Sequence, residues 1–227
     1  MKKYLYLIVS GAIFSLFILF TVLVKTVDVT YIYSNTYLGF TKINMDFGNW
    51  VMSLQKYDSM KKISDIFFYI SFGYVAILAG IGLYQLIKNK SLKAVDKRLW
   101  LLLAGYVVVV IFYFIFELVK VNYSPDVSEG IKASYPSSHV FIGCSFYLLN
   151  TYVCLKLLNS EKKWINYLAF GATLVICVLL TFSRALSAKH WLTDIIASVL
   201  LVISIYFAFV HFYHYFFSKE SETKTEE

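Results

Sequence analysis

Residues 195–217 read IIASVLLVISIYFAFVHFYHYFF, an apolar run without a lysine, arginine, aspartate or glutamate. A helix of about 20 such residues crosses the hydrocarbon core of a bilayer, which is about 30 Å thick. Five more runs of comparable character precede this one, at 4–24, 66–87, 99–116, 140–155 and 164–182. The pattern predicts an all-α, polytopic membrane protein with six transmembrane helices.

The composition of the whole chain agrees with this prediction. Of the 227 residues, 59% are apolar and 15% are charged, and the mean hydropathy is +0.66. These values exclude an ordinary soluble domain, in which about 25% of residues are charged. The net charge of +7 does not indicate a nucleic-acid partner, because the basic residues lie in short segments between apolar runs. We expect one membrane domain over 1–217 and a polar, disordered cytoplasmic tail over 218–227.

The basic residues also predict how the chain is oriented in the membrane. Lysine and arginine are enriched in cytoplasmic connections, and the connection between the second and third runs is rich in them: Lys88, Lys90, Lys93, Lys97 and Arg98. With this end inside, 12 of the 21 basic residues are cytoplasmic. We therefore expect a multi-pass plasma membrane protein with both termini in the cytoplasm. The connections after the first, third and fifth runs then face outward.

The first outward connection, 26–65, contains a short amphipathic pattern. Phe47, Trp50, Val51 and Leu54 recur at i, i+3, i+4 and i+7, and Asp46 stands where a helix N-cap is expected. The pattern predicts a short interfacial helix. It is either a lid or lipid-entry ramp, or a plain connector.

Two polar clusters stand at the ends of apolar runs, where unpartnered ionisable groups are costly and indicate function. One is Lys132-Ala-Ser-Tyr-Pro136-Ser137-Ser138-His139, and the other is Ser183-Arg184-x5-His190-x3-Asp194. Counting spans places both on the outward side. Single members could be helix caps or interfacial anchors, but the combination indicates a shared site.

The spacing within these clusters favours phosphate chemistry. His190 and Asp194 stand at i and i+4, so on a helix the carboxylate could hold one imidazole N–H and leave the other nitrogen free to attack. Ser137, Ser138 and His139 begin a helix, where free N–H groups attract anions. The planar guanidinium of Arg184 suits two phosphate oxygens.

These residues resemble the type 2 phosphatidic acid phosphatase family, the membrane branch of the superfamily that includes the vanadium haloperoxidases. Its third motif, S-R-x5-H-x3-D, is complete, and its second, P-S-G-H, reads Pro136-Ser137-Ser138-His139. The first motif, K-x6-R-P, departs, because Glu117 and Ser124 replace its lysine and arginine before Pro125. Lys120 and Lys132 could supply the missing charge from other positions, or they are ordinary loop lysines.

The resemblance implies an enzyme that hydrolyses a lipid phosphate or pyrophosphate without a metal or other cofactor. His190 would be the nucleophile, oriented by Asp194, and His139 would protonate the leaving alkoxide. Arg184, Ser137 and Ser138, with Lys132 and Lys120, would bind the phosphate. Undecaprenyl pyrophosphate, phosphatidic acid and phosphatidylglycerophosphate all remain candidate substrates.

Two other functions compete with this hypothesis. The first is a catalytically impaired membrane protein that binds lipid phosphates through a degenerate first motif. The second is a small transporter. This is the weakest of the three hypotheses, because the charges cluster at one end of the spans and no repeat is apparent. The sequence does not indicate an oligomeric state.

Overall fold

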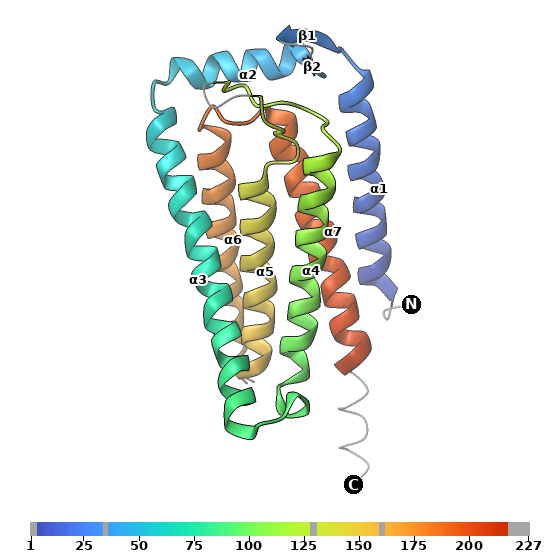
Figure 1. The fold of residues 1–227 in the computed structure, drawn as a ribbon, viewed down its shortest axis with the longest axis vertical. Helices are drawn as coiled ribbons and strands as arrows, with labels where there is room; N and C mark the ends of the chain where they lie inside the picture. Colours follow the sequence, from blue (N-terminus) through green and yellow to red (C-terminus); the bar gives the residue numbers. More distant parts are fainter. Residues whose placement is uncertain (1–3, 34–35, 128–130, 159–161, 218–227) are drawn as a thin grey trace.

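The structure is a computed structural model that describes residues 4–33, 36–127, 131–158 and 162–217. Six of its helices are long and apolar enough to cross a membrane, and they stand side by side as a bundle (Figure 1). They are α1 (Leu5–Thr26), α3 (Tyr57–Asn89), α4 (Lys97–Leu118), α5 (Ser138–Leu158), α6 (Lys163–Ala185) and α7 (Leu192–Phe217). The prediction of a six-span, helical membrane protein is confirmed.

Helix α5 forms the centre of the bundle and packs against α3, α4, α6 and α7. It has the lowest hydropathy of the six helices and is the most buried of them. The two properties are linked, because a helix shielded from lipid can carry polar side chains that bond to its neighbours. Thr151 of α5, for example, shares a hydrogen bond of 2.8 Å with Thr173 of α6.

The first and last spans pack against each other along their length. Ser10 Oγ donates to the Ser204 carbonyl at 2.8 Å, and Ser204 Oγ donates to the Ser10 carbonyl at 3.1 Å. The ring of Tyr4 lies 6.2 Å from that of His211. The start of α1 and the end of α7 are therefore at the same end of the bundle, as an even number of spans requires. The predicted tail, 218–227, lies outside the described residues.

Helix α3 begins at Tyr57 rather than at residue 66. The added turns contain charged residues, including Lys61 and Asp65, which end the apolar run but do not end the helix. They extend α3 past the apolar span to the same end of the bundle as the predicted polar clusters.

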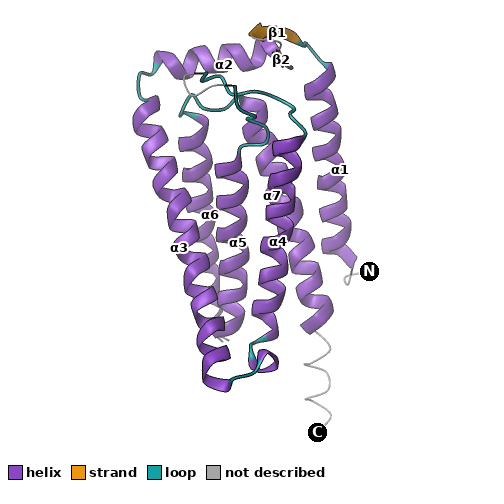
Figure 2. Cartoon of the chain, in the orientation of Figure 1, coloured by secondary structure: helices purple, strands orange, loops and turns teal. Residues whose placement is uncertain are grey.

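The first long connection lies across that end of the bundle, as Figures 1 and 2 show. It consists of strands β1 (Thr30–Tyr33) and β2 (Thr36–Leu38) in an antiparallel pair, followed by helix α2 (Thr41–Ser53). The sequence did not indicate the strands. The short helix is present, but Asp46 lies inside it and does not cap it, because the chain enters at Phe40 in a left-handed conformation. At the opposite end, a short 3₁₀ helix, η2 (Leu92–Ala94), connects α3 to α4.

Helix α2 is fastened to α1 and α7. A Cβ at Gly39 would lie 1.6 Å from the Val24 carbonyl oxygen, so only glycine permits this approach to the end of α1. The side chain of Asn44 is fully buried, and its Nδ2 donates to the Gly39 carbonyl at 2.8 Å and to Thr193 Oγ1 at 3.0 Å. Through Asn44, α2 is bonded to the first turn of α7, where the third motif ends.

Candidate active site

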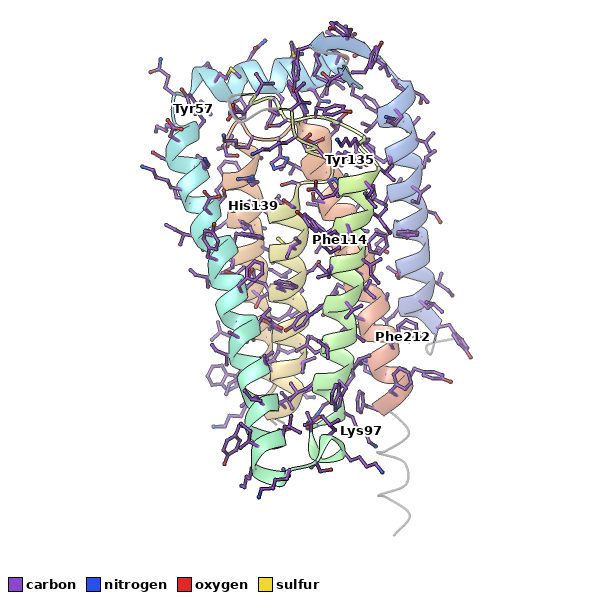
Figure 3. All side chains as sticks on the ribbon, viewed as in Figure 1. Tyr57, Lys97, Phe114, Tyr135, His139 and Phe212 are labelled. Carbon is purple, nitrogen blue, oxygen red and sulfur yellow. The ribbon has the colours of Figure 1, made fainter. Side chains whose placement is uncertain are left out.

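A cavity of about 570 Å³ opens at the end of the bundle that carries α2. Its wall is formed by the first turns of α3 and α5, the ends of α4 and α6, and the two connections between α4 and α5 and between α6 and α7. Figure 3 shows His139 near the top of the bundle, beneath these connections. The polar and charged residues of the wall are Lys61, Asp65, Tyr69, Glu117, Lys120, Ser124, Asp126, Lys132, Ser134, Ser138, His139, Arg184, Lys189 and His190.

The connection between α4 and α5 folds back on itself to form one side of the cavity. Tyr123 and Ala133 form an isolated antiparallel bridge. The Ser124 N–H donates to the Lys132 carbonyl at 2.9 Å, and the Ser134 N–H donates to the Asn122 carbonyl at 3.0 Å. This bridge places Ser124 beside Lys132.

His190 lies in the turn before α7 and is 9% exposed. Its Nδ1 lies 3.0 Å from the Ser134 carbonyl oxygen. A carbonyl can only accept, so Nδ1 carries the proton and donates it to Ser134. The other nitrogen, Nε2, then has a free lone pair. The imidazole is therefore held in the tautomer that a nucleophile needs.

Asp194 does not hold this imidazole in the way that the i, i+4 spacing indicates. His190 precedes the helix, and its Nδ1 lies 3.7 Å from Asp194 Oδ2, beyond hydrogen-bond distance. The carboxylate is fully buried and accepts from the Trp191 N–H at 3.1 Å and from Asn122 Nδ2 at 2.9 Å. Asp194 thus caps α7 and places a negative charge behind the imidazole. The direct hydrogen-bond partner of the imidazole is the Ser134 carbonyl.

Burial holds the pKa of the His190 imidazole below its ordinary value. The Asp194 carboxylate and the Ser134 carbonyl oppose this shift, and the charge of Arg184 adds to it. Because the pKa is lowered, the neutral and nucleophilic form of His190 persists to lower pH than that of a free histidine.

His139 and Arg184 meet at a carboxylate that the sequence analysis missed. Asp65 Oδ1 lies 3.2 Å from His139 Nε2 and 3.5 Å from Arg184 Nη1. The His139 ring stacks on Phe68 with 4.1 Å between centroids, and Arg184 is only 7% exposed. The signal in the sequence was a charged residue directly before an apolar run, but nothing local links that residue to His139.

The two serines of the second motif have different positions. Ser138 is part of the cavity wall, whereas Ser137 is fully buried behind it. The Ser137 N–H donates to the Asp194 carbonyl at 3.3 Å, and its own carbonyl accepts from Ser198 Oγ at 3.1 Å. Ser137 therefore joins α5 to α7 through its backbone, while its buried hydroxyl has no hydrogen-bond partner among the described residues. Its part in phosphate binding stays a prediction.

The departures in the first motif also lie on the wall. Glu117 and Ser124 both line the cavity, and so do the expected replacement cations Lys120 and Lys132. The two positions at which the motif has a lysine and an arginine therefore contribute one acidic and one neutral side chain to the wall. Lys61, Asp126 and Lys189 line the cavity as well but were not identified from the sequence; Lys189 forms an ion pair with Asp126.

A family model described as the PAP2 superfamily matches residues 98–218, more than half of the chain. The protein belongs to the PAP2 superfamily. The matched segment contains both polar clusters, and membership supports a membrane lipid phosphatase. No curated protein matches the sequence at a significant level.

The fold of this PAP2 protein is similar to a solved one. The crystal structure of the first transmembrane PAP2 type phosphatidylglycerolphosphate phosphatase from Bacillus subtilis aligns with a TM-score of 0.62. The alignment covers 89% of this chain and 94% of that one, at 18% sequence identity. At this identity the similarity establishes the fold alone.

Proposed function

We propose that this PAP2 protein hydrolyses a lipid phosphate or pyrophosphate through a phosphohistidine intermediate at His190. The observation that carries the proposal is the geometry of one cavity wall. It presents the free Nε2 of His190 together with Arg184 and His139, and a buried carboxylate stands behind the nucleophile. A neutral imidazole backed by a carboxylate is an activated nucleophile.

The reaction would proceed in two displacements. His190 Nε2 attacks phosphorus, the bond from phosphorus to the lipid oxygen breaks, and protonated His139 gives its proton to the leaving oxygen. Water then attacks the phosphohistidine, gives a proton to His139, and releases inorganic phosphate with regeneration of His190. Arg184, Ser138 and the first N–H groups of α5 would stabilise the equatorial oxygens, with Lys120 and Lys132 adding positive charge.

A second candidate function is lipid-phosphate binding without turnover. Glu117 and Ser124 on the cavity wall favour this candidate, because they stand where the lysine and arginine of the first motif would stabilise the charge that develops on the transferring phosphoryl group. The purified protein should be offered undecaprenyl pyrophosphate, phosphatidic acid and phosphatidylglycerophosphate, with phosphate release as the readout and His190→Ala as the control. Release that depends on His190 supports the enzyme, whereas saturable binding with no release from any of the three supports the binder.

We also propose that the protein resides in the plasma membrane with the cavity on the extracytoplasmic side, where lipid carriers expose their phosphates. The proposal rests on the distribution of basic residues. Lys56 is exposed at the end of the bundle that carries the cavity. Lys56→Cys, in a variant lacking Cys144, Cys154 and Cys177, should react with an impermeant thiol reagent on intact cells. Labelling only after the membrane is opened would show that the cavity faces the cytoplasm instead.

A further inference from the structure

The cavity wall has lost positive charge where the first motif would supply it. Glu117 and Ser124 stand at those two positions, and both side chains line the cavity. Besides Lys120 and Lys132, the wall carries Lys189, which is paired with Asp126, and Arg184, which lies 3.5 Å from the carboxylate of Asp65. A phosphate entering this cavity would gain from a further cation close to Arg184 and His139.

One face of α3 supplies a residue of this kind. Lys61, Asp65 and Tyr69 follow one another at i, i+4 and i+8, and all three line the cavity. Asp65 Oδ1 lies within 3.5 Å of both His139 Nε2 and Arg184 Nη1, so this face of α3 adjoins the catalytic groups directly. Lys61 lies one helical turn from Asp65 and is half-buried, whereas its neighbour Lys62 is exposed and is not among the residues of the wall.

Lys61 also stands close to the catalytic groups. Lys61, His139 and Arg184 line the same cavity, and His139 lies 3.2 Å from Asp65, which is one helical turn along α3 from Lys61. Within the residues that the structure describes, the Lys61 ammonium has no hydrogen bond or ion pair of its own, unlike that of Lys189. A lysine ammonium is a mobile point charge with three donors, and such a group binds phosphate oxygens well.

We infer that Lys61 binds the phosphate group of the substrate and takes over part of the role of the cations absent at Glu117 and Ser124. The inference rests on the proposed function, since it adds a ligand to the same site. It assigns to α3, outside the segment that the family model matches, a part in phosphate binding.

The test compares two adjacent lysines on one helix. Lys61→Gln removes the charge and keeps most of the side-chain stem, and Lys62→Gln makes the same change on the exposed face. Binding of inorganic phosphate to each purified protein is measured by calorimetry, and melting temperatures establish that both variants fold. We expect Lys61→Gln to weaken phosphate binding about tenfold or more, the range for loss of a charged hydrogen bond, and Lys62→Gln to change it less than about twofold. Lys61→Arg should restore most of the affinity, because it restores the charge.

Turnover separates this inference from the proposed function. If the wild-type protein releases phosphate, Lys61→Gln should raise KM more than it lowers kcat. Equal phosphate affinities in the Lys61→Gln and Lys62→Gln variants would overturn the inference and leave the phosphatase proposal intact. A wild-type protein without turnover, whose phosphate binding still depends on Lys61, would overturn the phosphatase proposal and leave this inference intact.

Discussion

Replacing Asn122 should slow the proposed reaction although Asn122 does not line the cavity. Its side chain is fully buried, and Nδ2 donates to Asp194 Oδ1 at 2.9 Å and to Thr193 Oγ1 at 3.2 Å. Asn122→Ala leaves the buried carboxylate with the Trp191 N–H as its remaining donor of those described. A hydrogen bond to a charged group contributes about 1.5–3 kcal/mol. If this energy serves to fix the charge behind His190, kcat falls about 10- to 100-fold.

The assay must separate positioning from a general loss of stability. Asn150 is a matched control, because it is also fully buried and hydrogen-bonded, but its partner is the Tyr106 hydroxyl and not Asp194. Asn122→Ala and Asn150→Ala should both lower the melting temperature of the purified protein. Only Asn122→Ala should lower kcat for phosphate release beyond what the folded fraction explains. Equal kcat losses in the two variants would refute the reasoning about Asp194.

Four further predictions concern the cavity itself. His190→Ala should abolish phosphate release with little change in melting temperature, and near wild-type release would end its assignment as nucleophile. Because burial lowers the pKa of His190, protonation should inactivate the enzyme only below the ordinary value of about 6.5; an acid limb of kcat/KM with its midpoint above that pH would contradict this. EDTA should leave activity unchanged, and vanadate should inhibit the enzyme, since vanadate adopts the shape of the transferring phosphoryl group. Activity that is lost on chelation and recovered on addition of magnesium would indicate a different mechanism. Ser124→Arg should raise turnover by about one to two decades through one charged contact. If Lys132 compensates in the native chain, Lys132→Ala should lower turnover less in the Ser124→Arg variant than in the native protein. Equal losses of turnover in both, with no gain from Ser124→Arg alone, would exclude a missing ligand at this position.

The spans were predictable because lipid imposes a length and an apolar composition that a single sequence displays. The start of α3 was not predictable, because Lys61, Lys62 and Asp65 lie before the apolar run although they are already part of the helix. The β1–β2 pair lacks the alternating pattern that marks a hairpin, and it depends on packing at the end of the bundle.

In the candidate site, the residues that belong to sequence motifs could be predicted, whereas their hydrogen-bond partners from distant segments could not. Span counting placed His139, Arg184 and His190 at one end of the bundle, and they do line one cavity. The spacing of His190 and Asp194 predicted a direct bond, but a helix that begins only at Leu192 leaves the Ser134 carbonyl nearer.

The missed partners all come from other elements. Asn44 bonds to Thr193, Asn122 bonds to Asp194, and Asp65 bonds to Arg184. None of these pairs has a local sequence pattern, because contacts between separate helices follow from the tertiary fold and not from periodicity.

The central claim, that His190 carries the phosphoryl group, can be tested by trapping the intermediate. Purified protein is mixed with a lipid phosphate that it hydrolyses, quenched in alkali within milliseconds to seconds, digested, and analysed by mass spectrometry for a phosphorylated histidine. We expect phosphate on the peptide that contains His190 in the wild-type protein, and no phosphorylated peptide with His190→Ala. Phosphate on another residue, or release at the wild-type rate from His190→Ala, would contradict it.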